Sequence, residues 1–209
     1  MATKIKQVQK TVSGEIDVFV GATDFKSQVL LDTECGGAIE NNLSIIPDGA
    51  VITLRRGTIA RKVTVKQEGS GECVANFMFV SKVLAETFQF KPNTRFVGTY
   101  NPANKTLTLR RKRVTVRNVV VTSSSKVRIE SVAIGDGLAI SMGNYLIGGE
   151  LLTLKHSTTR LRLRYVRIGD LFNNDFRLNP LNIRRLGLNA GKTYKVAYNQ
   201  CTREITFLT

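Results

Sequence analysis

The sequence predicts a mainly β protein made of two tandem small β-barrels, each with one short helix. Three observations predict this fold class. Short runs of alternating apolar and polar residues fill much of the chain of 209 residues. One order of such runs, with a single helix-like segment, occurs twice about 100 residues apart. Hydrophobic residues make up 42% of the chain, which is typical of a domain with a packed core.

Two alignments of the chain with itself show the repeat. At an offset of 100, AVITLRRGTIARKVTV (50–65) aligns with ELLTLKHSTTRLRLRY (150–165). At an offset of 98, FMFVSKVLAETFQFKPNTRFVGTYNPANKTLTL (77–109) aligns with FRLNPLNIRRLGLNAGKTYKVAYNQCTREITFL (176–208). Identical pairs include Thr53/Thr153, Leu54/Leu154, Thr58/Thr158, Tyr100/Tyr198 and Asn101/Asn199. We therefore expect two related barrels.

The domain boundary is predicted between the two copies. The stretch VVVTSSSK (119–126) separates them, and its three serines are typical of a short linker. This places a first barrel with an N-terminal extension at residues 1–122 and a second barrel at residues 123–209.

The first copy contains a strand, a helix and a hairpin in that order. ARKVTVK (60–66) alternates as a strand does. SKVLAETF (81–88) is helix-like, and its serine is the expected N-cap. TRFVGTY (94–100) and KTLTLRR (105–111) predict a hairpin, with Pro102 at a favourable turn position.

The second copy repeats this order. RLRLRY (160–165) alternates strictly, with leucine and tyrosine on one face and arginine on the other. PLNIRRLGL (180–188) predicts a helix with Pro180 in the first turn and Gly187 near the end. KTYKVAY (192–198) and REITFL (203–208) flank a predicted hairpin turn. Both helices are short, so packing on the barrel must stabilise them.

The segment 176–208 resembles the half-motif of double-psi β-barrels: a strand, a short helix, a Leu-Gly-Leu-x-x-Gly turn and a hairpin. AbrB-type regulators and MazE-type antitoxins, which are related cradle-loop barrels, contain a similar sequence motif. The resemblance implies double-psi-like barrels in which Leu186 and Leu188 plug the barrel end and Gly191 permits a tight turn. The first copy departs from the motif, because FQFKPN (88–93) lacks both glycines.

The resemblance leaves the function open, since these barrels include regulators, chaperone domains, protease relatives and polymerase cores. A second half-motif with its own helix is not evident in residues 16–50 or 127–150. A polymerase-like magnesium site needs several acidic ligands, whereas Gly135-Asp136-Gly137 offers one Asp and predicts a turn. An aspartic-protease motif fails at Asp32-Thr33-Glu34, which lacks the glycine.

Charge is the strongest compositional feature. The chain has 31 Lys and Arg against 16 Asp and Glu, a net charge of +15. Residues 1–50 carry four Lys and seven acids, so their net charge is −3, and residues 51–209 carry +18. This asymmetry favours a polyanionic partner bound by a basic surface.

The predicted nucleic-acid contacts are basic side chains on strands, on the helix of the second copy and in a cluster between the copies. Alternate arginines of a strand are about 6.6–6.8 Å apart, a spacing comparable to that of successive phosphates on a nucleic acid strand. The predicted contact residues are Arg55, Arg56, Arg61, Lys62, Arg110, Arg111, Lys112, Arg113, Arg117, Arg160, Arg162, Arg164, Arg167, Arg184 and Arg185.

Cysteine and histidine exclude several chemistries. Cys35, Cys73 and Cys201 are far apart, and His156 is the single histidine, so neither a zinc site nor a disulfide framework is expected. His156 is interpreted as a surface residue among cations. No phosphate-binding glycine loop, cofactor site or metal site is predicted. No run of about 18 apolar residues and no secretory signal is present, so a cytoplasmic location is expected.

We therefore expect a non-enzymatic protein that binds the phosphate backbone of DNA or RNA through basic strands and loops, as a transcription regulator would. The alternative is a protein-interaction or assembly module, such as a viral structural or accessory protein, that forms a homo-oligomer or binds an acidic protein partner. A third hypothesis is an enzyme that uses acids of the N-terminal segment. These acids are Glu15, Asp17, Asp24, Asp32 and Glu34.

Overall fold

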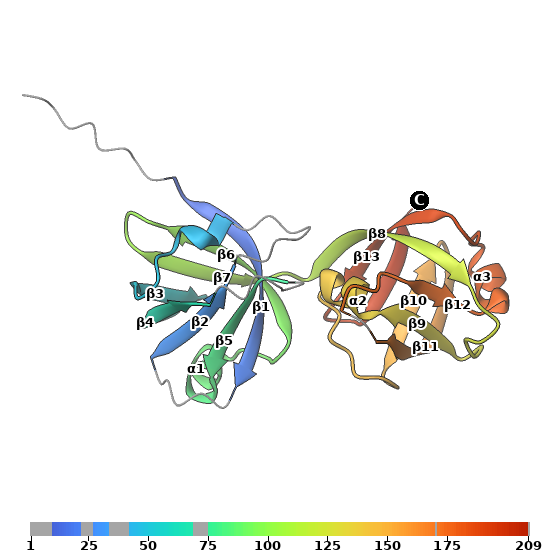
Figure 1. The fold of residues 1–209 in the computed structure, drawn as a ribbon, viewed down its shortest axis with the longest axis horizontal. Coiled ribbons are helices and arrows are strands. Elements are labelled where there is room, and N and C mark those ends of the chain that lie inside the picture. Colours follow the sequence, from blue (N-terminus) through green and yellow to red (C-terminus); the bar gives the residue numbers. More distant parts are fainter. Residues whose placement is uncertain (1–9, 22–26, 34–41, 69–74, 170, 209) are drawn as a thin grey trace, which may run out of the picture. The chain divides into compact units, whose positions relative to one another are not determined.

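The computed structural model describes residues 10–21, 27–33, 42–68, 75–169 and 171–208. The chain forms two units, Met1–Lys112 and Arg113–Thr209. In both units the strands close into a barrel (Figure 1). The unit boundary lies ten residues before the expected one (112 against 122), because the strand Val114–Ser123 pairs with the strands Phe176–Leu178 and Thr193–Asn199 of the second unit.

The first unit, barrel 1, closes in the strand order β1-β5-β2-β4-β3-β7-β6. Its elements are β1 (Val12–Gly21), β2 (Gln28–Asp32), the 3-10 helix η1 (Asn42–Ile45), β3 (Val51–Arg56), β4 (Ile59–Gln67), β5 (Phe77–Ser81), α1 (Lys82–Phe88), β6 (Thr94–Asn101) and β7 (Thr106–Arg111). The parallel pairs are β1/β5, β2/β4 and β3/β7, and the other neighbours are antiparallel.

The second unit, barrel 2, has the same architecture, with the closed order β8-β12-β9-β11-β10-β14-β13. Its elements are β8 (Val114–Ser123), β9 (Ser131–Gly135), α2 (Asp136–Met142), β10 (Leu151–His156), β11 (Thr159–Ile168), β12 (Phe176–Leu178), α3 (Pro180–Leu186), β13 (Thr193–Asn199) and β14 (Glu204–Leu208). Each pair of neighbouring strands has the same direction, parallel or antiparallel, as its counterpart in barrel 1.

The repeat predicted from the sequence is confirmed in the strand register. Thr53 pairs with Thr106 across β3 and β7, and Thr153 pairs with Glu204 across β10 and β14. Residues with positive φ recur at the same two offsets. These pairs are Gly49/Gly149, Gly57/Ser157, Gln89/Gly187, Asn93/Gly191 and Lys105/Arg203. The first copy therefore keeps the turn geometry of the Leu-Gly-Leu-x-x-Gly motif although it lacks the glycines.

The two predicted helices are present, and each begins at a side-chain cap. The Ser81 hydroxyl accepts a hydrogen bond from the amide of Leu84 at 3.2 Å, and the Asn179 side chain accepts one from the amide of Leu181 at 3.0 Å. Each helix ends at a left-handed residue, Gln89 or Gly187. The leucines of the motif are buried in the core of barrel 2, as the motif implies.

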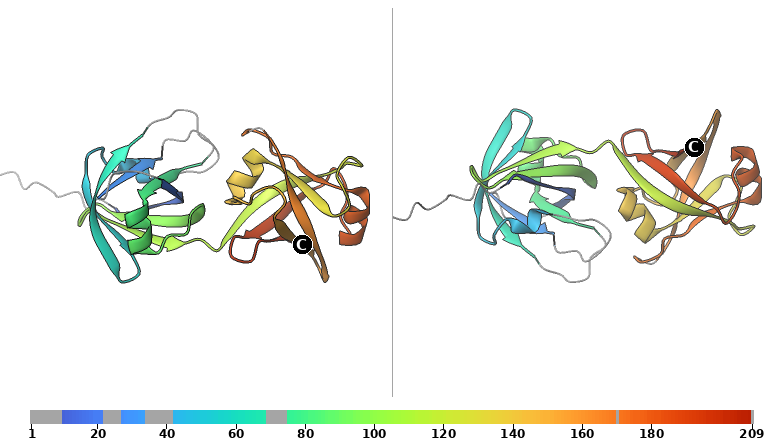
Figure 2. Two further views of the ribbon diagram at one scale, coloured as in Figure 1. Left: turned by 90° about the horizontal axis from the view of Figure 1, so that it is seen from below. Right: turned by 90° about the horizontal axis from the view of Figure 1, so that it is seen from above.

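Barrel 2 contains a further helix, α2, that the sequence did not predict. The sequence Gly135-Asp136-Gly137 was interpreted as a turn, but it is where α2 begins. The side chain of Asp136 is buried. A Cβ atom at Gly135 would overlap the backbone oxygen of Asn173, and Gly135 donates its amide hydrogen to Asp175. Position 135 must therefore be glycine because the loop that contains Asn173 passes close to its Cα atom, and not because the chain turns there. The views in Figures 1 and 2 place α2 and α3 at opposite ends of barrel 2.

The helix α2 completes an approximate internal two-fold symmetry in barrel 2. The segment β8-β9-α2-β10 corresponds to β11-β12-α3-β13, and β14 lies between β10 and β13. Under this correspondence the parallel pair β8/β12 matches β9/β11, and the antiparallel pair β8/β13 matches β10/β11. A second strand–helix segment, β9 and α2, thus lies at residues 131–142, where the sequence had shown no second helix.

Each barrel has its own hydrophobic core. In β11, the side chains of Leu161, Leu163 and Tyr165 are buried while the intervening arginines are exposed, which confirms the predicted alternation. In the described part of the chain, none of the helices combines the length and the apolar character needed to cross a bilayer.

Candidate functional site

The outer face of β11 carries a row of exposed arginines, Arg160, Arg162 and Arg164. The barrel fixes this row, because the residues between them are core residues and β11 is paired on both sides, with β9 and β10. Side chains that leave one face of a strand at every second position are about 6.6–6.8 Å apart along it. The row is thus a preformed line of positive charge.

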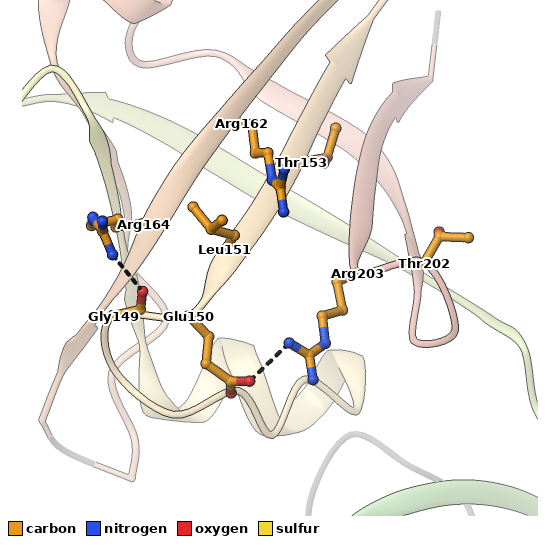
Figure 3. A pocket seen from close by; sticks show the side chains of 8 residues that line it. All are labelled: Gly149, Glu150, Leu151, Thr153, Arg162, Arg164, Thr202 and Arg203. Atoms are coloured by element: carbon orange, nitrogen blue, oxygen red, sulfur yellow. Dashed lines mark hydrogen bonds and ion pairs between the residues drawn. The ribbon is translucent and has the colours of Figure 1, made fainter.

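Two of these arginines line an open hollow of about 590 Å³, here named the barrel 2 hollow (Figure 3). Its lining residues are Gly149, Glu150, Leu151, Thr153, Arg162, Arg164, Thr202 and Arg203. The formal charge of these side chains is +2, from three arginines and one glutamate. An anion is therefore the ligand that this hollow favours.

The three arginines of the barrel 2 hollow differ in their partners. Arg203 Nη1 donates to Glu150 Oε1 at 2.8 Å, and Arg164 Nη1 donates to the carbonyl oxygen of Gly149 at 3.3 Å. The guanidinium of Arg162 makes no hydrogen bond or ion pair with any residue that the structure describes. Figure 3 shows the side chains of Arg162 and Arg203 extending into the same space, whereas Arg164 turns toward Gly149.

Arg160 and Arg167, also predicted as contacts, have acidic partners. Arg160 lies 3.8 Å from Glu204, and Arg167 Nε donates to the Oδ1 atom of the buried Asp136 at 2.5 Å. This hydrogen bond and the charge of Asp136 raise the pKa of Arg167 above its ordinary value. Arg167 thus holds the start of α2 to the end of β11.

In barrel 1, Arg55, Arg61 and Lys62 are exposed as predicted, but Arg56 has a structural role. Its guanidinium donates to the carbonyl oxygen of Phe88 at the end of α1 and lies over two aromatic rings, 5.5 Å from Phe90 and 5.7 Å from Phe96. A cation at a helix C-terminus stabilises the exposed carbonyls there.

His156 occupies the position of barrel 2 that corresponds to Arg56. Its Nδ1–H donates to the carbonyl oxygen of Leu186 at 2.7 Å, and its ring packs edge-on against Tyr194 and Phe207. His156 is therefore a half-buried structural residue that ties β10 to α3, not the surface residue expected from its basic neighbours.

The remaining predicted contacts divide into exposed and engaged side chains. Lys112 forms an ion pair with Glu15, and Arg117 donates to the carbonyl oxygen of Val116 at 2.8 Å. Arg111 is half-buried, with a Nε atom that has no partner among the described residues. The exposed ones are Arg110, Arg113, Arg184 and Arg185.

The sequence reading missed Arg203 and its counterpart Lys105, which are the last turn residues of the β13–β14 and β6–β7 hairpins. Lys105 lines a smaller hollow of about 400 Å³, here named the barrel 1 hollow. Its lining residues are Lys10, Ile45, Pro47, Ala50, Tyr100, Pro102 and Lys105. Alignment of Lys105 with Arg203 in the repeat was the signal that could have identified both.

The acids of the enzyme hypothesis that the structure describes are buried or paired. The Asp17 carboxylate accepts two hydrogen bonds from Arg95, each at 2.7 Å, and Glu15 pairs with Lys112 and Arg95. Asp32 is buried. Asp24 and Glu34 lie outside the described residues. Within the described ranges, no group of three His, Cys, Asp or Glu side chains is arranged to hold a metal ion.

Comparison of the chain with protein-family models, with curated proteins and with solved structures finds no match.

Proposed function

We propose that this protein is a non-enzymatic nucleic-acid-binding protein that binds phosphate groups through basic strands and loops. One observation carries the proposal: Arg162, which has no partner among the described residues, lies in a hollow with Arg164 and Arg203 on a rigid barrel face. A guanidinium binds phosphate through two parallel hydrogen bonds, and a fixed strand lowers the entropy lost on binding.

The exposed arginines suit a phosphate backbone better than a single small anion. They continue as a row along β11 rather than closing around one point, and the barrel 2 hollow is open. Such contacts read charge and not base sequence. Each phosphate contact releases counterions, so the logarithm of the binding constant falls with the logarithm of the salt concentration by about 0.9 per contact on duplex DNA.

The test is a titration of labelled duplex DNA, single-stranded DNA and RNA at several salt concentrations. We expect Arg162→Gln and Arg164→Gln each to weaken binding and to reduce the salt slope by about 1. Arg128→Gln is the matched control, because Arg128 is 82% exposed and lies outside the hollow. Absence of binding at low salt, binding without a salt slope, or equal effects of all three variants would contradict the proposal.

We further propose that the barrels belong to the double-psi and AbrB–MazE-like cradle-loop group and act in transcription regulation. Support comes from the internal two-fold of barrel 2 and from the turn at Leu186–Gly191, where both leucines are buried and Gly191 has a φ of 80°. The duplicated chain offers internally the pair of modules that a dimeric regulator has. An exposed free thiol at Cys201 fits the reducing cytoplasm as its location.

A second candidate function, self-assembly into a homo-oligomer, is favoured by one apolar surface. Val114, Val116 and Val120 are 39–46% exposed on the outer face of β8. Such a strand face can bury its apolar area against a second copy of the chain. Measurement of the mass in solution tests this function: an oligomer that Val116→Lys dissociates supports it, and a monomer excludes it.

A further inference from the structure

The barrel 1 hollow differs in chemistry from the barrel 2 hollow, although each lies between the chain segment that precedes β3 or β10 and the turn of the last hairpin. Ala50 replaces Glu150, so no acidic side chain lines the hollow beside Lys105 in the described part of barrel 1, while the corresponding Arg203 is paired. Apolar and aromatic residues form most of the lining. Two lysines among apolar residues in a volume of about 400 Å³ are typical of a site for a small organic ligand.

A tyrosine hydroxyl that has no hydrogen-bond partner among the described residues provides a second, independent observation. Tyr100, which lines the barrel 1 hollow, is 4% exposed, and its hydroxyl makes no hydrogen bond with the described residues. In barrel 2 the corresponding Tyr198 donates to Asn144 Oδ1 at 3.3 Å. The side chain of Tyr100 is otherwise enclosed, so a group that enters the hollow is the partner available to its hydroxyl.

The Tyr100 hydroxyl is also in a suitable state and place to bind a ligand. The Tyr100 oxygen is not one of the fully enclosed side-chain polar atoms that lack a partner among the described residues. It is therefore accessible from the hollow. Burial raises the pKa of Tyr100, so the hydroxyl is protonated at neutral pH and can donate. The hollow thus combines a hydrogen-bond donor, two cations and an apolar wall.

We propose that the barrel 1 hollow binds a small organic anion, with its negative group between Lys10 and Lys105, an acceptor atom on the Tyr100 hydroxyl and its apolar body against Ile45 and Pro47. Two kinds of ligand have these properties. One is a free aromatic anion, and the other is a mononucleotide, which has a base with apolar faces and a charged phosphate. The proposal does not depend on the nucleic-acid function, because it uses a different barrel and different residues.

The experiment is NMR titration of the full chain with three probes: adenosine monophosphate, anilinonaphthalene sulfonate and inorganic phosphate. We expect the first two, or one of them, to shift resonances of Ile45, Ala50 and Lys105, while phosphate alone shifts them at least tenfold more weakly. Shifts with the nucleotide alone identify a nucleotide site, and shifts with the sulfonate alone identify a site for other aromatic anions. Both outcomes support the proposal.

Two matched tyrosine variants test the role of the free hydroxyl. Tyr100→Phe removes only the oxygen and is expected to weaken probe binding about three- to tenfold, the effect of one hydrogen bond. Tyr198→Phe, which removes the bonded hydroxyl of barrel 2, should leave it unchanged. Lys105→Gln should weaken binding and reduce its salt dependence. Equal effects of the two tyrosine variants, shifts confined to barrel 2, or no shift with any probe would overturn the proposal.

Discussion

The buried ion pair of barrel 1 gives the sharpest prediction about stability. Asp17 and Arg95 face each other across β1 and β6, and both side chains are 1% exposed. Two parallel hydrogen bonds of 2.7 Å join the guanidinium to the carboxylate. Arg95→Met removes the cation and leaves the Asp17 carboxylate in a site that water does not reach. Loss of one partner of such a pair costs about 3–5 kcal/mol.

The assay is urea unfolding of the full chain, followed by NMR signals from each barrel. We expect Arg95→Met to lower the free energy of unfolding of barrel 1 by about 3–5 kcal/mol, and the signals of barrel 2 to keep their midpoint. Arg128→Met is the control, because the Arg128–Glu130 pair is exposed and 4.0 Å long. We expect it to change stability by less than about 1 kcal/mol.

The double variant Asp17→Leu with Arg95→Met separates the lost attraction from the cost of a buried carboxylate that has lost its guanidinium partner. Replacement of both partners by apolar side chains is expected to regain most of the loss, because no charge then remains buried. A loss below about 1 kcal/mol for Arg95→Met, or a double variant as unstable as the single one, would refute the reasoning.

Three further predictions concern the structural residues of the repeat. Burial raises the pKa of Tyr198 to about 12, so the folded state keeps a proton that the unfolded chain loses near pH 10. The contribution of Tyr198 to the stability of barrel 2 should be intact below pH 10 and fall by about 2 kcal/mol up to pH 12, and a pH series of urea unfolding should show a smaller fall in Tyr198→Phe than in the unchanged protein. Gln89→Gly should stabilise barrel 1 by about 0.5–1 kcal/mol, since Gln89 has a φ of 53°, whereas Gly187→Ala should destabilise barrel 2 by about 1 kcal/mol in the same assay. His156→Ala should lower the stability of barrel 2 by about 1–2 kcal/mol by loss of its bond to Leu186, and an unchanged unfolding midpoint would contradict this role.

Local patterns were sufficient to predict much of the fold. Alternation identified the buried and exposed faces of β11, and Ser81 and Pro180 indicated the starts of α1 and α3. These signals work because side-chain direction in a strand and capping of a helix depend on residues only a few positions apart. The offsets of the repeat predicted that the two barrels would be alike before any strand pairing was known.

The candidate site was predictable only in part. Exposure of Arg160, Arg162 and Arg164 followed from alternation, but the hollow that Arg162 shares with Arg203 joins β11 to the turn before β14. Arg56 carries the same charge as Arg162 and is nevertheless engaged with Phe88 and two aromatic rings. Charge in a sequence does not show which cation has a partner, because that partner is distant along the chain.

The sequence by itself determined the class of the fold, its duplication, the caps of two helices and the basic character of the chain. Only the tertiary structure decided that β8 belongs to barrel 2, that Gly135 and Gly137 begin a helix under a crossing loop, and that Tyr100 lacks the partner that Tyr198 has. The physical reason is the range of the forces: propensity and periodicity act over a few residues, whereas burial, pairing and polar satisfaction depend on contacts made across the barrel.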